Sequence, residues 1–524
     1  MAEEIADLFR KVTAHAKEYG FIYPSSEVYD GLGAVYDYGP NGVELKNNIK
    51  QYWWAAMVQL QENIVGLDSA IFMHPRIWKA SGHVDAFNDP LVDNKDTRKR
   101  YRADVLLEEA VERYLAKADK EVEKASRRFG ESFDEALFRQ TNERVLALSD
   151  KAAKLAEGLA DAMRRGDMPA LGELMAEEEI ADPETGSRNW TDVRQFNLMF
   201  FTQLGNISGE EGKLYLRPET AQGIFVNFLN VQKTTRQKIP FGIAQIGKAF
   251  RNEIVARQFI FRMREFEQME MQFFIRPGEE LDWYARWKAF RMRWHLALGT
   301  PSVKLRFKDH DNLAHYANAA VDIQFDFPFG FRELEGIHSR TDFDLRSHQE
   351  LSGKKMQYFD PELNESYIPY VVETSIGCDR MFLAMLSHAY TEEQLPDAEG
   401  NESTRVLLRL HPALSPVKAA ILPLLKNREE LTTAARDIYQ KLRLAFSCQY
   451  DEKDAIGRRY RRQDAIGTPF CITIDFETLE NGTITLRDRD TLKQERMLPD
   501  EATARIRSRT DMAALLEGLG EIPV

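Results

Sequence analysis

The chain has 524 residues, of which 43% are hydrophobic and 29% are charged, and its formal net charge at pH 7 is −13. The composition is ordinary for a globular protein with a sizeable core, and at about 150 residues per domain the length predicts roughly two to four domains. No apolar run reaches the ~18 residues that a membrane span needs, so we expect no membrane association. The acidic total argues against a general nucleic-acid coat protein. Residues 404–524 are nearly neutral, with 20 Lys/Arg and 18 Asp/Glu, and could still bind a polyanion through local arginine clusters.

Only three cysteines occur, at Cys378, Cys448 and Cys471, and they lie far apart in the sequence. This spacing excludes a disulfide framework and a cysteine-based zinc site, so no structural zinc is expected. The acidic start of the chain lacks a basic region followed by an apolar stretch, and it does not resemble a secretory signal. We therefore expect a reducing, cytoplasmic location.

The first clear helical pattern runs from residue 41 to residue 60. Its apolar residues recur at three- and four-residue spacing, which is typical of an amphipathic helix. An extended run follows over 69–75, where a proline ends it. Trp53, Trp54 and Met57 exceed what one helix face normally buries, so we expect this helix to pack against a second copy of the chain.

Between about residues 104 and 190 the composition changes to Ala, Leu, Glu, Lys and Arg with few glycines. Apolar residues fall on one helix face, which favours helices. The residues on that face are Leu106, Leu107, Ala110, Val111, Tyr114 and Leu115. We predict a helical insertion, and its simplest interpretation is a solvated helical hairpin without chemistry.

After residue 190 the pattern becomes strand-like. The runs 244–253 and 261–274 predict an antiparallel pair of strands, and 367–373 predicts another strand. A helix is predicted over 380–388, and the polar stretch 391–403 predicts a linker. Beyond the linker, strands and helices alternate in a compact mixed domain of ~100 residues.

One strand face in this region carries side chains with binding chemistry. Residues two apart on a strand point the same way, so five residues would share a face. They are Arg262, Arg264, Phe266, Gln268 and Glu270. Arg251 and Glu253 would share a face on the preceding strand. Guanidinium groups bind phosphate oxygens, a ring stacks on a base, and a carboxylate can hold an ammonium, so the row fits a nucleoside triphosphate beside an amino acid. The alternative is an exposed, salt-bridged strand face.

A second group of polar residues could be mistaken for a metal cluster. It consists of Asp309, His310 and Asp311 with His315. Their spacing matches no standard ligand set, so we interpret the group as structural. The chain also has no nucleophile elbow, Walker loop or dinucleotide-binding glycine fingerprint.

Three segments resemble the signature motifs of class II aminoacyl-tRNA synthetases. The second motif is similar to Arg251-Asn-Glu253 followed by Arg262-x-x-x-Phe266-x-x-x-Glu270. The third is similar to Gly377-Cys-Asp-Arg380 at the start of a helix. The helix 41–60 resembles the first motif, which in that class forms the dimer interface.

Further segments resemble the glycyl-tRNA synthetases of the homodimeric type. They are 35–42, 78–83, 216–223, 259–270 and 340–345. The segments 457–464 and 467–470 resemble the anticodon-binding domain of that family. The resemblance covers nearly the whole chain outside the insertion, and Thr374 departs from the proline that many members have.

The resemblance implies an α+β fold with a class II antiparallel sheet flanked by helices. The implied division is a catalytic domain over 1–103 and 191–395, the helical insertion over 104–190, a mixed α/β anticodon-binding domain over 404–510 and a C-terminal tail over 511–524. It implies glycine–tRNA ligase activity, in which ATP activates glycine to glycyl-adenylate and glycine then passes to the 3′ end of tRNA(Gly). The implied ligands are ATP, Mg²⁺, glycine and tRNA(Gly), and the implied assembly is a homodimer.

The resemblance also implies roles for individual residues. Arg251 and Arg380 would be catalytic, Glu333 would hold Mg²⁺ with ATP, Ser375 would form the pocket floor, and adenine would lie between Phe266 and Arg380. The implied ATP-binding residues are Arg251, Asn252, Glu253, Phe261, Arg262, Phe266, Glu333, Leu334, Gly377 and Arg380. The implied glycine-binding residues are Arg100, Glu219, Phe266, Gln268, Glu270, Glu373 and Ser375. The implied tRNA-binding residues are Arg458, Arg459, Arg461 and Arg462.

Two other functions fit the sequence less well. A non-catalytic relative would have lost charged motif residues, but all three motifs keep theirs. A ligase that acts on an acceptor other than tRNA would be expected to lack the anticodon-binding domain, which residues 404–510 resemble. The sequence does not indicate the role of the insertion.

Overall fold

The computed structural model describes residues 2–130, 133–205, 212–253, 258–310, 313, 317–396 and 402–522. It divides the chain into two compact units. The first consists of Met1–Ser81, Phe201–Phe250 and Arg257–Val524, and the second of Gly82–Phe200 and Arg251–Ala256. Among the described residues, no helix has both the length and the apolar character required to span a membrane.

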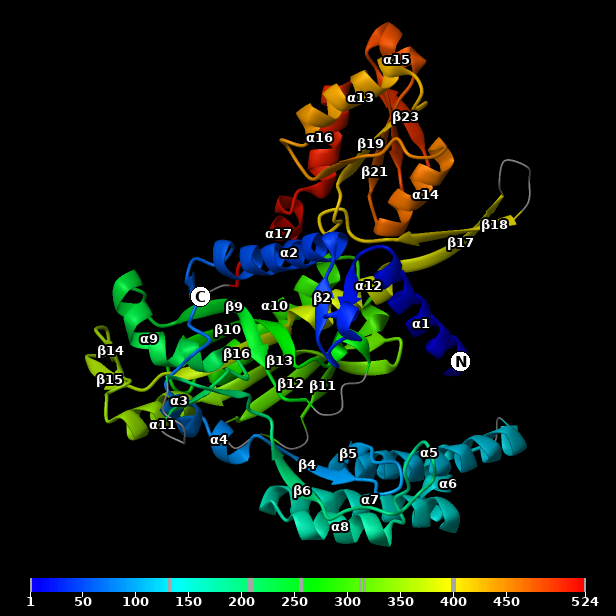
Figure 1. The fold of residues 1–524 in the computed structure, drawn as a ribbon. Helices are drawn as coiled ribbons and strands as arrows, with labels where there is room; N and C mark the ends of the chain where they lie inside the picture. The colour runs from blue at the N-terminus through cyan, green and yellow to red at the C-terminus, as the bar shows by residue number, and fades with distance from the viewer. Residues whose placement is uncertain are drawn as a thin grey trace. The chain divides into compact units, whose positions relative to one another are not determined.

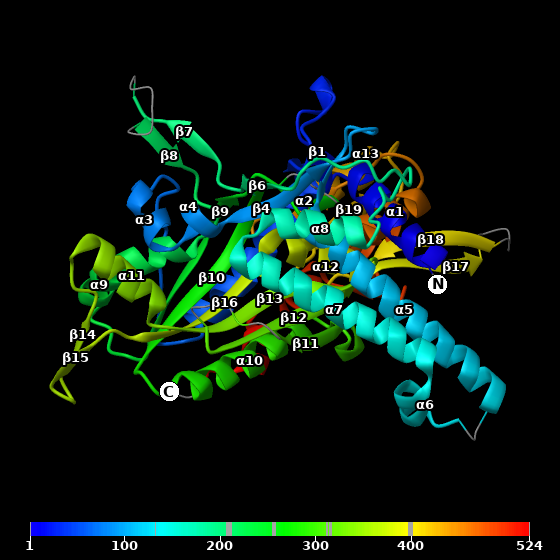
Figure 2. The ribbon, with the colours of Figure 1, turned by 90° about the horizontal axis from the view of Figure 1, so that it is seen from below.

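A seven-stranded sheet forms the centre of the first unit (Figure 1). In spatial order its strands are β11 (Leu305–Asp309), β12 (Ala319–Phe327), β13 (Gly330–Thr341), β16 (Tyr370–Gly377), β10 (Glu265–Ile275), β9 (Phe241–Phe250) and β3 (Ile64–Gly66). Neighbouring strands are antiparallel except β3 and β9, which are parallel. Figure 2 shows β10, β16, β13, β12 and β11 in this order. An antiparallel sheet can bury one face in the core and leave the other for a binding site.

Three helices cover one face of this sheet. They are α2 (Pro40–Trp54), α10 (Glu280–Ala297) and α12 (Cys378–Ala389). Alternate residues of the strands, such as Met269, Met271 and Phe273 of β10, pack with these helices in the largest hydrophobic core of the chain. Burial of such large apolar side chains is the main stabilising contribution to this layer.

The helix predicted over 41–60 consists of α2 and a π-helical turn at Ala55–Gln59. The expectation that Trp53, Trp54 and Met57 exceed what the single chain can bury is wrong for two of these residues. Trp53 and Met57 are both 0% exposed within the core of the single chain, because α10, α12 and the sheet already cover them. The homodimer itself stays a prediction.

The two strands predicted over 244–253 and 261–274 are shorter than expected. β9 ends at Phe250, and β10 begins at Glu265 after a 3₁₀ turn at Phe259–Phe261. The Phe261 ring packs edge-on against the rings of Phe327 and Phe329, with ring centroids 5.2 Å apart in each pair, and this packing fits a turn rather than a strand. The predicted single row is therefore wrong at its start, because Arg262 and Arg264 precede β10.

The second unit combines a small sheet with four longer helices and the short helix α4 (His83–Ala86). The sheet has the order β5 (Arg100–Arg102), β4 (Asn88–Asp93) and β6 (Arg194–Asn197), and the longer helices are α5 (Ala103–Phe129), α6 (Glu135–Thr141), α7 (Glu143–Arg165) and α8 (Met168–Glu177). α5 and α7 lie side by side in both ribbon views and share a core that includes Leu107 and Leu155. The unit extends beyond the predicted limits 104–190, because Val92 and Tyr101 of the sheet belong to the same core.

The C-terminal part of the first unit is built around a five-stranded sheet. Its strands are β20 (Cys448–Tyr450), β19 (Ala419–Pro423), β21 (Phe470–Ile474), β22 (Ile484–Asp488) and β23 (Gln494–Met497), with helices α13 (Glu429–Leu442), α14 (Ile456–Ile466) and α16 (Pro499–Thr510). β19 is parallel to both of its neighbours, and the last three strands are antiparallel. The mixed α/β architecture predicted for this region is confirmed.

The linker predicted over 391–403 is wrong where the structure describes it. β17 (Tyr390–Pro396) pairs antiparallel with β18 (Glu402–Leu408), and residues 397–401 lie outside the described residues. Arg405 of β18 is 1% exposed, and its Nε donates to Asp464 Oδ2 at 2.8 Å. This buried ion pair anchors the strand to α14, so the segment is part of a folded hairpin.

The remaining elements of the first unit surround these two sheets. They are α1 (Ala2–Glu18), β1 (Ile22–Pro24), β2 (Tyr36–Tyr38), α3 (Pro75–Ala80), β7 (Phe201–Gln203), β8 (Lys213–Tyr215), α9 (Ala221–Thr235), α11 (Phe343–Ser352), β14 (Tyr358–Asp360), β15 (Glu365–Tyr367), α15 (Phe476–Asn481) and α17 (Ala513–Leu519). α9 and α11 share a second hydrophobic core with the ends of β9, β10 and β16.

Candidate active site

The second face of the central sheet carries polar side chains on β10 and β16. Gln268, Glu270 and Gln272 alternate with the core residues Met269 and Met271, so they point away from the helices. The strand register places Gln268 opposite Gly377, Glu270 opposite Ser375 and Gln272 opposite Glu373. Gln268 Nε2 donates to Ser375 Oγ at 3.4 Å. The fold therefore brings four of the predicted glycine-binding residues, Gln268, Glu270, Glu373 and Ser375, onto one face.

Two of these residues are buried acids that share one amide. Gln272 Nε2 donates to Glu270 Oε1 at 2.9 Å and to Glu373 Oε2 at 2.6 Å. The Thr220 hydroxyl also donates to Glu270. Glu270 is 2% exposed and Glu373 4% exposed, so both carboxyl groups have lost most of their hydration.

The two acids differ in their charged neighbours. Arg340 Nη1 lies 3.1 Å from Glu373 Oε2, and His338 Nδ1 lies 2.9 Å from Glu373 Oε1. Burial alone would raise the pKa of Glu373, but Arg340 and the hydrogen bonds from His338 and Gln272 hold it well below its usual range. Burial raises the pKa of Glu270 well above its usual range, and the negative charges of Glu373 and Glu219 raise it further.

Arg340 is held in place by a chain of buried polar contacts. Its Nε and Nη2 donate to Asp344 at 2.8 and 3.0 Å. Gln222 Nε2 donates to Asp344 at 3.0 Å and to Glu219 at 2.9 Å. Glu219 is thus linked to the same network as Glu373, and the three predicted acids Glu219, Glu270 and Glu373 belong to one cluster.

Arg340 and His338 were not among the predicted site residues. Arg340 stands in the segment 340–345 that resembles the family, but nothing in its spacing ties it to Glu373, 33 positions later. The register of β13 against β16, which sets His338 opposite Glu373, supplies that link.

Arg380 lies at the other end of this face, in the first turn of α12. Its guanidinium lies 4.6 Å from the centre of the Phe261 ring. Nε donates to the Phe261 carbonyl at 3.3 Å, and Nη1 lies 3.1 Å from Glu333 Oε1. The predicted ATP-binding residues Phe261, Glu333 and Arg380 are therefore neighbours. The stacking partner that the structure gives Arg380 is Phe261, whereas stacking of adenine between Phe266 and Arg380 stays a prediction.

A buried ion cluster fixes the residue before Arg380. Asp379 Oδ1 lies 2.6 Å from Lys46 Nζ, and Asp379 Oδ2 accepts from the backbone N–H of Glu267 at 2.7 Å. Lys46 Nζ also lies 3.0 Å from Glu267 Oε2, and the Tyr38 hydroxyl donates to Asp379. This cluster joins α2, β10 and α12, so the three segments that resemble the class II motifs meet at Lys46 and Asp379.

Four predicted site residues belong to the second unit. The Arg251 guanidinium lies 5.4 Å from the centre of the Phe87 ring, and the Asn252 N–H donates to the Leu198 carbonyl at 2.8 Å. Glu253 is buried in the same unit. Arg100 makes a two-pronged ion pair with Asp93, at 2.6 and 3.1 Å. Their roles toward ATP and glycine stay predictions.

Leu334 can reach a ligand only through its backbone. Its side chain is 1% exposed and belongs to the main core, below the sheet. Phe266, Arg262 and Gly377 are half-buried, and Gly377 is the N-cap residue of α12. Their predicted contacts with ATP stay predictions.

The arginine run on α14 does not form a uniform surface patch. Arg459 is 1% exposed, and its guanidinium donates to the carbonyls of Pro423 and Leu424 at 2.5 and 3.1 Å. These backbone acceptors hold its guanidinium inside the domain, and its predicted contact with tRNA stays a prediction. Arg462 pairs with two aspartates, each at 2.7 Å. Arg458 is exposed and Arg461 is half-buried.

Comparisons with known proteins identify similar sequences along most of the chain. The model of the tRNA synthetase class II core domain (G, H, P, S and T) matches residues 204–389, that of the glycyl-tRNA synthetase insertion domain 1 matches 89–198, and that of an anticodon binding domain matches 418–509. A glycine–tRNA ligase of Chlorobaculum tepidum is 52% identical over 488 residues, which cover 93% of this chain and 97% of the relative. Glycine–tRNA ligases of Geobacillus thermodenitrificans and Staphylococcus aureus are 49% and 46% identical, over 94% and 95% of this chain and 96% and 98% of their own lengths.

Proposed function

The chain belongs to the glycine–tRNA ligase family of class II aminoacyl-tRNA synthetases, and we propose that it joins glycine to tRNA(Gly) in two steps. In the first, the glycine carboxylate attacks the α-phosphate of ATP and releases pyrophosphate, which leaves glycyl-adenylate. In the second, a hydroxyl at the 3′ end of tRNA(Gly) takes the glycyl group and AMP leaves. The observation that carries the proposal is the buried cluster of Glu219, Glu270 and Glu373 on the sheet face that also bears Arg380.

The acid cluster fits the ammonium group of glycine. Glu373 is held ionised by its direct ion pair with Arg340, whereas burial and the charges of Glu373 and Glu219 raise the pKa of Glu270, so Glu270 keeps its proton more readily. A bound ammonium would favour the ionised form of Glu270, just as an opposite charge does at any buried acid. Glycine has no side chain to contact, so selectivity depends on filling the space that a methyl would occupy. Ser375, which lies between Glu270 and Gly336 in the strand register, would do this.

Arg380, Phe261 and Glu333 fit the nucleotide end of the site. The reaction needs no nucleophile from the protein, because glycine itself supplies the attacking oxygen. Arg380 would bind the negative charge of the phosphates, and Arg251 and Arg262 would assist it as the resemblance implies. Catalysis then consists of aligning the two substrates and neutralising charge as the pentavalent transition state forms.

Mg²⁺ is the expected companion of ATP. Glu333 is half exposed and offers one carboxylate beside Arg380, and Mg²⁺ in phosphate sites typically needs only one or two protein carboxylates. The residues present therefore fit the ion. When bound, Mg²⁺ would supply charge neutralisation between the phosphates, and Glu333 would exchange its ion pair with Arg380 for the metal.

The C-terminal domain would bind the anticodon of tRNA(Gly), supported by its match to the anticodon binding domain. The exposed Arg458 and the half-buried Arg461 would make this contact, because their side chains are not fully buried. Assembly as a homodimer and a cytoplasmic location complete the proposal. The three free cysteines are compatible with a reducing compartment.

The test is pyrophosphate exchange with ATP and each of the twenty amino acids in turn. We expect exchange with glycine alone, and charging of tRNA(Gly) with glycine. Replacement of Arg380 by Ala should reduce glycine-dependent exchange by about 3–4 kcal/mol in the specificity constant, the typical effect of removing one group that stabilises charge in the transition state. Exchange with a different amino acid, or none with any, would contradict the proposal.

A further inference from the structure

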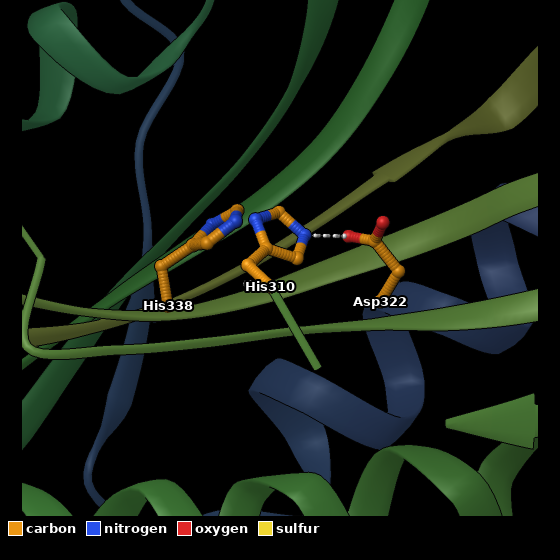
Figure 3. A group of neighbouring side chains, drawn as sticks. All are labelled: His310, Asp322 and His338. Atoms are coloured by element: carbon orange, nitrogen blue, oxygen red, sulfur yellow. Dashed lines mark hydrogen bonds and ion pairs between the residues drawn. The ribbon is translucent and has the colours of Figure 1, made fainter. Parts of the chain in front are cut away.

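Three side chains with metal-binding groups meet on neighbouring strands of the central sheet (Figure 3). His310 directly follows β11, Asp322 lies on β12 and His338 lies on β13. One ligand atom from each lies within 4.8 Å of the others. The His310 N–H donates to the Ala320 carbonyl at 3.1 Å, and Ala320 pairs with His338 in the sheet, so the backbone ladder holds all three positions.

The spacing of these atoms is close to that of a zinc site. His310 Nε2 and Asp322 Oδ1 are 2.9 Å apart. In a tetrahedral site with zinc–ligand distances near 2.0–2.1 Å, two ligand atoms lie about 3.3 Å apart. The first pair therefore needs little adjustment. The three ligand atoms lie within 4.8 Å of one another, so His338 would have to approach the other two by up to about 1.5 Å to complete a tetrahedral site.

The orientation of His338 provides a second, independent observation. Glu373 occupies its Nδ1 at 2.9 Å, which leaves Nε2 for another partner. A carboxylate on the second ring nitrogen is the usual outer contact of a metal-binding histidine, because it fixes the tautomer and the ring orientation. The ring lies over Gly336, where a Cβ would approach His338 Cε1 to 2.8 Å. Glycine at this position therefore gives the ring the room it needs.

We propose that His310, Asp322 and His338 bind one Zn²⁺ ion, with the fourth position open to water. Two imidazoles and a carboxylate suit Zn²⁺, and three protein ligands with one open position are a known zinc arrangement. This proposal departs from the expectation of no structural zinc, which was based on the cysteines alone, because no cysteine takes part in the site. The ion fixes His338 and, through it, Glu373 at the acid cluster. The site thus goes beyond the proposed ligase activity and links a metal to the amino-acid pocket.

The alternative is that His310–Asp322 and His338–Glu373 are two separate histidine–carboxylate pairs. Two separate pairs would not require the two imidazole rings to be neighbours. The rings of His310 and His338 are neighbours, with centroids 5.7 Å apart and an interplanar angle of 72°. A direct measurement of metal binding distinguishes the two interpretations, because only the zinc site predicts that these residues bind one ion.

The experiment is titration of the full chain, freed of metal by a chelator, with Zn²⁺ alone in a calorimeter. We expect one equivalent to bind to the parent protein, and at least tenfold weaker binding to His310→Ala and to Asp322→Asn. Asp322→Asn keeps the size of the side chain and an acceptor for His310 but is a poor zinc ligand. His74→Ala removes an exposed histidine outside the cluster, and Cys448→Ser removes the half-buried thiol, so both should bind as the parent does.

Co²⁺ in place of Zn²⁺ gives a second readout on the parent protein. We expect visible absorption bands typical of four-coordinate Co²⁺, and their loss in Asp322→Asn. Binding of no equivalent to the parent, or equal binding by the parent and both site variants, would overturn the proposal. Metal binding is measured without glycine, ATP or tRNA, so its failure is distinguishable from failure of the proposed ligase activity.

Discussion

At the scale of single residues, Glu270 and Glu373 show how neighbours set the behaviour of identical groups. Both are buried and share the amide of Gln272, but only Glu373 has a guanidinium at 3.1 Å. One acid therefore stabilises the fold when ionised, whereas the other resists ionisation. The combination of the two acids suits the binding of an ammonium group. The ionised Glu373 attracts the ligand, and Glu270 ionises once the ligand is present.

Replacement of each acid by Gln should change stability in opposite directions. The folded-state pKa of Glu270 is raised, so ionisation in the unfolded state makes the parent less stable as pH rises above about 4.3. The Glu270→Gln variant has no carboxyl group to ionise and does not lose this stability. The melting temperature of the variant, relative to that of the parent, should therefore rise between pH 4 and pH 8. The folded-state pKa of Glu373 is lowered, so its contribution is present at neutral pH and is lost as pH falls below about 4.3. Glu373→Gln should therefore lose about 1.5–3 kcal/mol at pH 7.

Thermal unfolding at several pH values measures both effects. Both variants should also bind glycine more weakly in pyrophosphate exchange, since each loses a charge from the ammonium site. A stability change of the same sign at pH 8 would show that the two carboxyl groups do not differ as described.

Selectivity against alanine is predicted to depend on Ser375. Its Oγ is held by Gln268 at 3.4 Å, beside Glu270 in the sheet. A single methyl is worth only ~1–3 kcal/mol of discrimination in a pocket, so a filled floor must contribute through steric exclusion. Ser375→Gly should raise the specificity constant for alanine relative to glycine in pyrophosphate exchange. Ser366→Gly, on the exposed strand β15, serves as the control, and an unchanged ratio in Ser375→Gly would show that the floor lies elsewhere.

At the scale of elements, hydrophobic spacing correctly predicted α2, helices between residues 104 and 190 and the core of β10, because α2, α5, α7 and β10 each bury a set of regularly spaced apolar side chains. The same reasoning failed between Phe250 and Glu265, where the chain leaves the sheet. There the packing of the Phe261 ring favours a turn instead of a strand, and alternating hydrophobic spacing in the sequence does not indicate this packing. The polar stretch 391–403 was mistaken for a linker because the partner that anchors it, Asp464, lies about 60 residues later.

The junction of α2, β10 and α12 leads to a prediction about Lys46. Its ammonium is buried between Asp379 and Glu267, at 2.6 and 3.0 Å. Removing one partner of a buried ion pair leaves an uncompensated charge and typically costs about 3–5 kcal/mol. Lys46→Met should lower stability by this amount in denaturant unfolding. It should also raise the KM for ATP, because Asp379 loses its ion pair and holds the first turn of α12, which carries Arg380, less firmly.

Lys50→Met provides the matched control. Lys50 lies on the same helix one turn later and contacts Glu267 at 3.2 Å, but its side chain is 26% exposed. Its loss should cost less than about 1 kcal/mol, as for ion pairs near the surface. Equal effects of the two changes on stability and on the KM for ATP would contradict a bracing role for Lys46.

At the scale of the whole molecule, resemblance and strand alternation singled out three acids that the fold brings into one cluster, but not the contacts that set their pKa values. Arg340 and His338 reach Glu373 because β13 lies beside β16, and that neighbourhood follows from the order of the strands rather than from local spacing. The same limit applies to the arginine run of α14. Its composition predicted a binding surface, whereas the packing of the helix on β19 decided which side chains remain at the surface.

The two steps of the proposed reaction depend on different parts of the chain, so the arginines of α14 should affect them differently. Arg458 is exposed, and Arg458→Ala should weaken tRNA charging by about 1–3 kcal/mol in the specificity constant if it contacts a base edge of the anticodon. Glycine-dependent pyrophosphate exchange should stay unchanged, because the proposed adenylate site belongs to the seven-stranded sheet and Arg458 to the C-terminal domain. Loss of both activities together would instead indicate a folding defect.

Arg459→Ala is the contrasting variant in the same helix turn. Its guanidinium ties α14 to the carbonyls that follow β19, and hydrogen bonds that involve a charged group contribute about 1.5–3 kcal/mol each at most sites. This variant should lower the stability of the C-terminal domain in thermal unfolding, and charging should recover at lower temperature. For Arg458→Ala, the charging defect should persist at every temperature, with a melting curve like that of the parent. If the two variants behaved alike in both assays, the division between an RNA-facing and a structural arginine would be wrong.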